Sequence, residues 1–228
     1  MKKFWGFLLV IVLMTSCGEY QSLLKSNDYN LVYKKAIEYY NKGDYQRAMN
    51  LLDGVRSVFV GQAKAQNIAY YRAFCSYNMK DYQIASDLFK QFIQTYPESS
   101  FAEECLYMMG FCDYKASPKP RLDQQVTEKA IREFQLYLSR YPYSMRKDKV
   151  NTYMDEMRDK LSYKAYLSAK NYYLREHYKA AVISLQNCLK DYPGSKYREE
   201  IMYMLFVSKY QMAVNSVEDK KVERYNNA

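Results

Sequence analysis

The chain has 228 residues, of which 49% are hydrophobic, and a formal net charge of +9 at pH 7, with Lys and Arg interleaved among Asp and Glu. Because no dense basic block stands out, the charge favours a solvated surface beside anionic lipid and argues against a nucleic-acid partner. Only 7 glycines and 5 prolines interrupt apolar residues at helical spacing, so the sequence predicts an all-α protein.

The first predicted element is a secretory signal in residues 1–16. Lys2 and Lys3 form a basic start, residues 4–14 are almost wholly apolar, and the chain turns polar directly after Cys17. Such a run is too short for a membrane-spanning helix, which needs roughly 20 residues. The stretch LMTSC also resembles the lipobox of bacterial lipoproteins, in which the signal is cut before an acylated cysteine. An ordinary signal peptide with an incidental cysteine is the alternative.

Internal repeats follow a predicted linker at 17–28. Three segments align without gaps: YKKAIEYYNKGDYQRAMNLL from Tyr33, YRAFCSYNMKDYQIASDLFK from Tyr71 and YLSAKNYYLREHYKAAVISL from Tyr166. Each carries two alanines twelve residues apart: Ala36 and Ala48, Ala73 and Ala85, Ala169 and Ala181. Small residues at that spacing, with an aromatic residue after the intervening turn, are the pattern of the tetratricopeptide repeat, a pair of closely packed helices. The sequence therefore predicts a tetratricopeptide-repeat superhelix of about five helix pairs.

Two more repeats appear when insertions are allowed. The third contains Gly110 and Ala130 and has extra residues around KASPKPRLDQQ in its turn. The fourth is expected to open with one long helix that starts near Lys147, since neither Gly nor Pro interrupts it. The fifth begins with KYREEIMYMLFVSKYQM, and Tyr225 is expected to open its second helix. We expect further chain or a partner to cover the apolar face of the fifth repeat.

Tyrosines seven residues apart recur in the first helix of every predicted repeat. This tyrosine ladder consists of Tyr33 and Tyr40, Tyr70 and Tyr77, Tyr107 and Tyr114, Tyr166 and Tyr173, and Tyr203 and Tyr210. A tyrosine offers a flat ring and a hydroxyl at low entropic cost, which suits a binding surface. The ladder either lines a concave groove or packs successive first helices together, and the sequence leaves both open.

The sequence offers no constellation for catalysis. His177 is the single histidine and stands in a predicted turn, where other repeats carry Asp44 and Asp81. No phosphate-binding loop, nucleophile motif or metal-ligand spacing appears, so we predict neither an enzyme nor a metal site. The cysteines in apolar helical contexts are expected to be small buried hydrophobes: Cys75, Cys105, Cys112 and Cys188. Cys105 and Cys112 are too far apart on one helix for a mutual disulfide, and other pairings stay open.

The combination of these features resembles the BamD family, the lipoprotein subunit of the outer-membrane β-barrel assembly machine. The lipobox, five repeats, the insertion in the third turn and the long helix of the fourth repeat carry the likeness. So do the segments FKQFIQTYP, LYMMGFCDY and AKNYYLREHYKAAVISLQNCLKDYPGS. The resemblance spans roughly residues 28–215. The tyrosine-rich composition and the unfinished fifth repeat depart from the commoner pattern of that family.

The resemblance implies a scaffold at the periplasmic face of the outer membrane, anchored by acyl chains on Cys17 and without another cofactor. Residues 29–144 would bind unfolded barrel precursors in a groove formed by Tyr33, Tyr40, Asn41, Tyr70, Tyr77, Asn78, Tyr107 and Tyr114. Precursor side chains would insert between the tyrosines, and Asn41 and Asn78 would meet its backbone. Residues 145–228 would dock on the barrel-forming subunit and other complex members through Tyr166, Tyr173, Tyr203 and Tyr210.

Two other functions stay open for a lipoprotein built from such repeats. One is a scaffold that coordinates cell-wall or envelope synthesis, although such scaffolds usually carry a coiled-coil segment and no heptad run is visible here. The other is a nutrient-binding lipoprotein with a tetratricopeptide core. Proteins of that kind are far longer and have large inserts that build a sugar site, so this second function is the less favoured one.

We predict that Cys17 is acylated and becomes the mature amino terminus. Cys17→Ser should leave an unlipidated precursor that no longer partitions into detergent, because two or three acyl chains make a lasting anchor. Metabolic labelling with a fatty acid, followed by detergent phase separation, measures both properties. Cys75→Ala is the control and should keep the label. Lipid labelling that persists in Cys17→Ser would contradict the prediction.

Overall fold

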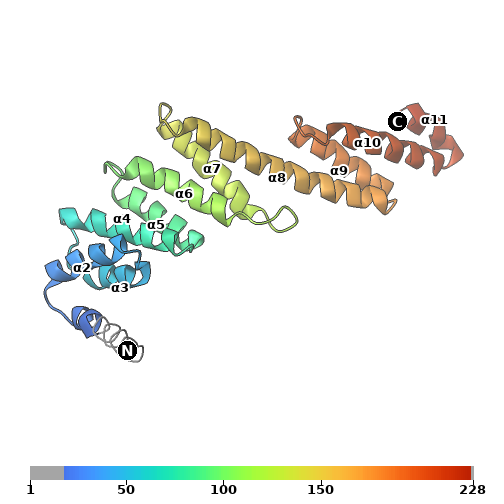
Figure 1. The fold of residues 1–228 in the computed structure, drawn as a ribbon. Helices are drawn as coiled ribbons and strands as arrows, with labels where there is room; N and C mark the ends of the chain where they lie inside the picture. Colours follow the sequence, from blue (N-terminus) through green and yellow to red (C-terminus); the bar gives the residue numbers. More distant parts are fainter. Residues whose placement is uncertain (1–17, 227–228) are drawn as a thin grey trace, which may run out of the picture. The chain divides into compact units, whose positions relative to one another are not determined.

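The computed structural model describes residues 18–226, and Figure 1 shows their arrangement. The predicted signal and Cys17 lie outside the described residues. All helices with defined bounds in the described part are α2 (Tyr29–Asn41), α3 (Tyr45–Val55), α4 (Ala63–Asn78), α5 (Tyr82–Thr95), α6 (Ala102–Ala116), α7 (Gln125–Arg140), α8 (Lys147–Leu174), α9 (Tyr178–Asp191), α10 (Arg198–Val214) and α11 (Glu218–Asn226). No strand occurs among these residues, so the predicted all-α fold is confirmed.

The helices follow one another in five pairs, from α2 with α3 to α10 with α11, as the repeats predict. They form two compact units. The N-terminal unit comprises the chain up to Ala116 together with Lys129–Tyr143, and the C-terminal unit comprises Ser117–Glu128 together with the chain from Ser144. Within the units, each helix packs on its neighbours in sequence, and α8 also contacts α10. The functional division into 29–144 and 145–228 stays a prediction.

Small side chains lie where the two helices of a pair come together. The alanines that defined the sequence repeats are fully buried: Ala36, Ala48, Ala73, Ala85, Ala169 and Ala181. In the third repeat Gly110 takes this position, and a Cβ atom there would lie 2.8 Å from Cδ1 of Phe134. Since real Cβ atoms do not approach other carbons so closely, α6 needs glycine at this point. The register read from the sequence is confirmed.

The same turn joins the two helices in repeats one, two and four. Gly43, Lys80 and Glu176 have positive φ angles of 81°, 67° and 61°, and only the glycine adopts this conformation without steric cost. The next amide closes each turn by donating, over 3.0 Å, to a carbonyl five residues earlier: Asp44 to Tyr39, Asp81 to Ser76, and His177 to Tyr172. This is the bond pattern of a Schellman motif. His177 is therefore a turn residue, as predicted.

The third and fourth repeats contain the predicted irregularities. Residues 117–124 form an insertion loop between α6 and α7, and α8 is one helix of 28 residues that starts at Lys147. Since α8 carries no Gly or Pro, nothing in its interior favours a break. Both features follow the sequence prediction.

The second helix of the fifth repeat was predicted wrongly. Tyr225 does not open this helix, because α11 already begins at Glu218 and Tyr225 lies in its last turn. The position of the small residue in α10 is taken by Phe206, whose side chain is 56% exposed. The fifth pair therefore lacks a small residue at this point; α10 and α11 are in contact, but α11 buries none of its own residues. The ring of Tyr225 instead contacts Tyr210, with 5.8 Å between centroids.

The described part of the predicted linker packs on the first helix pair. Residues 18–24 are helical, and Tyr20 and Leu23, three positions apart on one face, are buried. Nδ2 of Asn50 donates to the Tyr20 hydroxyl over 3.0 Å, and the Tyr20 ring meets Tyr39 edge-on at 5.9 Å. Burial of Tyr20 and Leu23 therefore fixes residues 18–24 on the first helix pair, although the sequence predicted a linker here.

The four cysteines of the described chain are buried and unpaired. Burial raises the pKa of Cys75 and of Cys105 to about 12, so both thiols stay protonated and unreactive at neutral pH. Their prediction as small buried hydrophobes is confirmed. No described helix combines the length and the apolar character needed to cross a bilayer.

A cluster of charged groups is buried where α5, α6 and α7 meet in the N-terminal unit. Nζ of Lys129 lies 2.9 Å from Asp113 Oδ2 and 3.7 Å from Glu133 Oε1, and the Ser86 hydroxyl donates to Asp113 over 3.1 Å. Oε2 of Glu133 is buried without a hydrogen-bond partner. Burial and the neighbouring Asp113 raise the pKa of Glu133 to about 8. The Lys129 ammonium, which also lies 3.9 Å from Asp87 Oδ1, thus serves three carboxyl groups, and burial favours the protonated form of Glu133.

This cluster predicts that stability falls as the pH rises from 6 to 8. The unfolded chain has lost the Glu133 proton above its ordinary pKa of about 4.3, whereas the folded chain keeps it up to about 8. Between these values the folded state binds more protons, so raising the pH costs stability. Glu133→Gln should reduce the loss by roughly 1–2 kcal/mol.

Urea titrations at pH 6 and pH 8 measure this difference. Glu128→Gln, at an exposed position of the same helix, is the matched control and should keep the wild-type dependence. Equal pH dependence in Glu133→Gln and the wild type would contradict a protonated Glu133.

Candidate functional site

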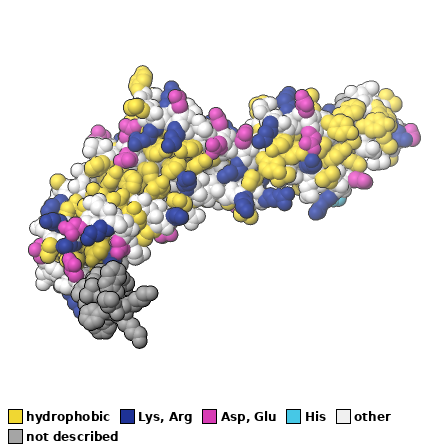
Figure 2. All heavy atoms as spheres, viewed as in Figure 1, with side chains coloured by type: hydrophobic (Ala, Val, Ile, Leu, Met, Phe, Trp, Pro, Cys, Tyr) yellow, Lys and Arg dark blue, Asp and Glu magenta, His cyan; other side chains and the backbone are white. Residues whose placement is uncertain are grey.

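The N-terminal unit contains a groove of about 520 Å³ between α2, α4 and the residue that precedes α6. We call it the N-terminal groove. It is lined by Tyr33, Lys34, Ile37, Glu38, Asn41, Asn67, Tyr70, Tyr71 and Phe101. Among the residues predicted to form a precursor site, it brings together Tyr33, Asn41 and Tyr70. Hydrophobic side chains also gather along α4 and α6 in Figure 2.

One wall of the groove is a single face of α2. Tyr33, Ile37 and Asn41 are spaced four residues apart, so their side chains lie one above another on that face. The Tyr33 ring contacts Phe59 at 6.1 Å, and Nζ of Lys64 lies 5.7 Å from its centroid. The hydroxyl of Tyr33 has no hydrogen-bond partner among the described residues, so it can bond to a ligand.

The opposite wall is centred on Tyr70 of α4. Its ring packs on Phe101 at 4.6 Å between centroids, and its hydroxyl donates to Glu104 Oε2 over 2.8 Å. Burial, followed by the bond to Glu104, raises the pKa of Tyr70, so the hydroxyl stays a donor at any physiological pH. This ring therefore joins two successive first helices while one edge lines the groove.

The chemistry of the groove suits an extended peptide with aromatic side chains. Rings form its walls, and the amides of Asn41 and Asn67 can both donate and accept hydrogen bonds. A backbone in extended conformation needs such mixed partners along its length. Among the described residues, no group of His, Cys, Asp or Glu side chains could hold a metal ion.

The other predicted groove residues of the first two repeats take part in packing. The Tyr40 ring lies edge-on to Tyr45 at 5.5 Å and to Tyr71 at 4.9 Å, and burial raises the pKa of Tyr40 to about 12. Tyr77 contacts Tyr82 at 5.9 Å between centroids. Nδ2 of Asn78 donates to a carbonyl of its own helix. The structure thus separates these side chains from the N-terminal groove.

The ladder tyrosines of α6 flank Phe111. Tyr107 and Tyr114 stack on this ring from two sides, with centroid distances of 5.7 and 5.9 Å. Tyr107 is buried and also contacts Tyr137 at 5.9 Å. Tyr33 and Tyr70 thus line the groove, whereas Tyr107 is buried and the other ladder rings of this unit are half-buried against neighbouring rings. A binding role for the ladder stays a prediction.

In the C-terminal unit the ladder divides into buried and exposed tyrosines. Tyr166 is 5% exposed, lies under the ring of Tyr197 at 4.3 Å and donates to Glu200 Oε2 over 2.7 Å. Tyr173 is half-buried. By contrast, Tyr203 of α10 is 64% exposed, and Tyr210 is exposed as well.

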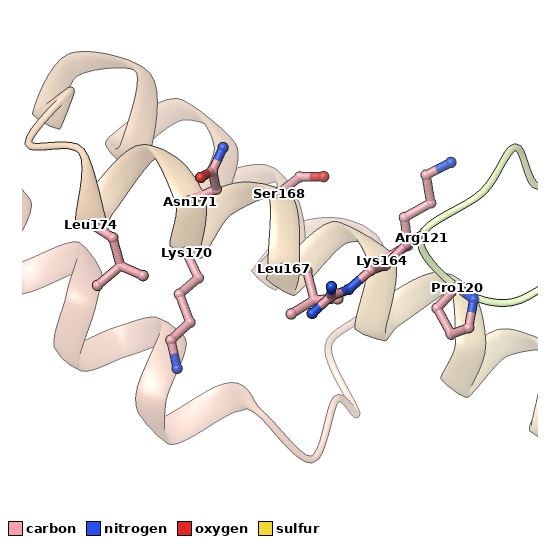
Figure 3. A pocket seen from close by; sticks show the side chains of 8 residues that line it. All are labelled: Pro120, Arg121, Lys164, Leu167, Ser168, Lys170, Asn171 and Leu174. Atoms are coloured by element: carbon pink, nitrogen blue, oxygen red, sulfur yellow. The ribbon is translucent and has the colours of Figure 1, made fainter.

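A second groove, of about 500 Å³, lies between the insertion loop and α8 in the C-terminal unit. We call it the basic groove. It is lined by Pro120, Arg121, Lys164, Leu167, Ser168, Lys170, Asn171 and Leu174, and Figure 3 shows Pro120 and Arg121 reaching it from the loop. Lys170 is balanced by Glu200, at 2.7 Å. Arg121 and Lys164 leave the groove positive beside an apolar floor.

Hydrogen bonds hold the insertion loop in place beside α8. Nζ of Lys164 donates to the Leu122 carbonyl, and Nζ of Lys160 donates to the Ser117 hydroxyl, each over 2.7 Å. Inside the loop, Nε2 of Gln124 donates to the carbonyls of Lys119 and Leu122. The extra residues of the third turn are thus an ordered wall of the basic groove.

Sequence reasoning missed several lining residues. Ile37 could have been found from its spacing to Tyr33 on one helical face. Phe101 and Arg121 could not, because each reaches its groove from a different element than the helix it faces. Their contribution depends on how successive elements pack, and no local pattern records it.

Comparison with known proteins assigns the chain a family. The model of the YfiO family, described as outer membrane lipoprotein, matches residues 25–224. This range includes both grooves and the helices from α2 to α10, together with α11 up to Arg224. A comparison with curated proteins gave no significant match.

The geometry of the two groove tyrosines predicts a difference in stability. Tyr70→Phe removes a hydrogen bond to the Glu104 carboxylate and should cost about 1–2 kcal/mol in the free energy of unfolding. Tyr33→Phe removes an unbonded hydroxyl and should stay within about 0.5 kcal/mol of the wild type. Urea titrations of the two variants provide the comparison. Equal changes in both would argue against the bond to Glu104.

Proposed function

The chain belongs to the YfiO family of outer membrane lipoproteins, and on this premise we propose that it is a scaffold of the β-barrel assembly machine. It would sit at the periplasmic face, held by acyl chains on Cys17. It would act by binding and not by catalysis, in keeping with the resemblance to the BamD family. The observation that carries the proposal is the N-terminal groove, where ladder tyrosines meet amide side chains.

The groove would receive the end of an unfolded barrel precursor. The final strand of such precursors often ends in an aromatic residue, and its ring would fit beside those of Tyr33, Tyr70 and Phe101. Asn41 and Asn67 would bond to the extended backbone, which lacks partners until the barrel closes. Because the groove would contact only an aromatic side chain and the backbone, it would bind many different precursors.

The C-terminal unit would dock on the barrel-forming subunit and other members of the complex. Two surfaces support this role: the exposed ladder tyrosines Tyr203 and Tyr210, and the basic groove with Arg121 and Lys164. Exposed aromatic rings supply contact area at low entropic cost. The positive groove favours an acidic segment and accelerates its association. Precursor binding and docking would thus occupy different repeats.

Titration with a peptide that ends in an aromatic residue tests the precursor site. Tyr33→Ala should weaken binding by roughly 1–3 kcal/mol, since it removes an aromatic wall of the groove. Asn41→Ala should cost roughly 0.5–1.5 kcal/mol through a lost hydrogen bond. Tyr143→Ala is the matched control, because this tyrosine is 97% exposed and lines no groove.

Thermal melts of the same variants separate binding from packing. If Tyr33→Ala lowers the melting temperature and leaves peptide affinity unchanged, the groove is a packing feature and the precursor site is refuted. Purification from native membranes tests the complex. Recovery with a large barrel protein supports the proposal, and recovery with cell-wall synthases would favour the alternative of an envelope-synthesis scaffold.

A further inference from the structure

Two ladder tyrosines are covered in the same way by the start of the next first helix. Phe101 stands directly before α6 and packs on Tyr70, while Glu104 accepts the Tyr70 hydroxyl over 2.8 Å. In the C-terminal unit, Tyr197 stands directly before α10 and stacks on Tyr166 at 4.3 Å. Glu200 there accepts the Tyr166 hydroxyl over 2.7 Å.

Both helix starts therefore share one arrangement. An aromatic residue directly precedes the helix, and a glutamate occupies its third position. The ring covers the tyrosine face, and the carboxylate accepts a charge-assisted hydrogen bond from the tyrosine hydroxyl. A glutamate in the first turn is also stabilised by the helix dipole. The aromatic residue and the glutamate thus contact both the ring face and the hydroxyl of the tyrosine.

Tyr203 holds the same ladder position in α10, but none of the described residues covers it in this way. Its side chain is 64% exposed, and Met202, Phe206 and Tyr210 beside it on α10 are exposed as well. We call these four residues the Tyr203 face. Hydrophobic side chains gather over α10 in Figure 2. Of these four, Tyr210 contacts Tyr225 of α11, with 5.8 Å between ring centroids.

We propose that the Tyr203 face binds a helix of another polypeptide, one that is preceded by an aromatic residue and carries a glutamate at its third position. The inference rests on the proposed docking role of residues 145–228. The partner chemistry is that of the contacts that cover Tyr70 and Tyr166 within the chain. The partner ring would lie on Tyr203 and Phe206, and its carboxylate would accept the Tyr203 hydroxyl.

A second copy of the chain does not supply such a helix from its described residues. Only α6 and α10 are preceded by an aromatic residue there, and the starts of both already cover Tyr70 and Tyr166. The other described helices follow Asp, Gln, Arg, His or Val residues. Since the described helices of a second copy offer no free start of this kind, the proposal commits to a different polypeptide as the partner.

A helical peptide that copies residues 196–200, followed by an alanine-rich helix, is the probe. Binding to the full chain is followed by fluorescence anisotropy. Tyr203→Phe should raise the Kd about tenfold, the loss expected for one hydrogen bond to a carboxylate. Glu200→Gln in the peptide should have a similar effect, and the two changes together should cost little more than either alone. Tyr143→Ala in the chain should leave the Kd unchanged.

The result that overturns the inference is a Kd that does not respond to Tyr203→Phe, or the absence of binding. Self-association of the chain that Tyr203→Ala abolishes would also overturn it, because the occupant would then be a second copy. Purification from native membranes separates this from the proposed function. If the barrel protein is recovered equally with the wild type and Tyr203→Ala, only the inference fails. If the wild type itself recovers no barrel protein, the proposed function fails.

Discussion

The close approach of paired helices at one small residue governs the rest of this molecule. Gly110 has no room for a Cβ atom against Phe134, and Ala36, Ala73 and Ala169 are fully buried at the same position. A ladder tyrosine precedes each of these residues by three positions, so the packing that fixes the small residue also fixes the direction of the ring. In the fifth repeat Phe206 stands at this position and is 56% exposed, and the ladder ring of Tyr203 is 64% exposed.

Features that depend on neighbours in sequence could be predicted from the sequence. The register of the repeats, the long α8 and the turn at His177 follow from local spacing and from the absence of helix breakers. Such patterns are strong because the same requirement recurs in each repeat, and a small residue at a helix contact has few substitutes. The start of α11 was predicted wrongly because Tyr225 was aligned with the tyrosines that open the other second helices. The fifth repeat also differs from the others at Phe206, nineteen residues earlier.

Properties that depend on side chains from other helices could not be predicted from local spacing. The sequence places Tyr33, Tyr166 and Tyr203 at one ladder position, yet the first lines a groove, the second is buried under Tyr197 and the third is exposed. The pKa of Glu133 is raised by burial beside Asp113, which lies on another helix. In each case the property is set by the covering element and not by the residue type.

The proposed binding surfaces therefore lie where a repeat leaves ladder side chains uncovered. A ladder tyrosine that contacts an aromatic residue and a glutamate of the next first helix has its ring and hydroxyl bound within the chain. These contacts stabilise the folded state. A tyrosine that meets neither keeps the same ring and hydroxyl available to a ligand. Under the proposed docking, the Tyr203 face would reuse an internal contact whose second half the partner supplies. The strength of the internal contact then sets an upper limit on what a partner helix gains, since the partner must also lose its own freedom on binding.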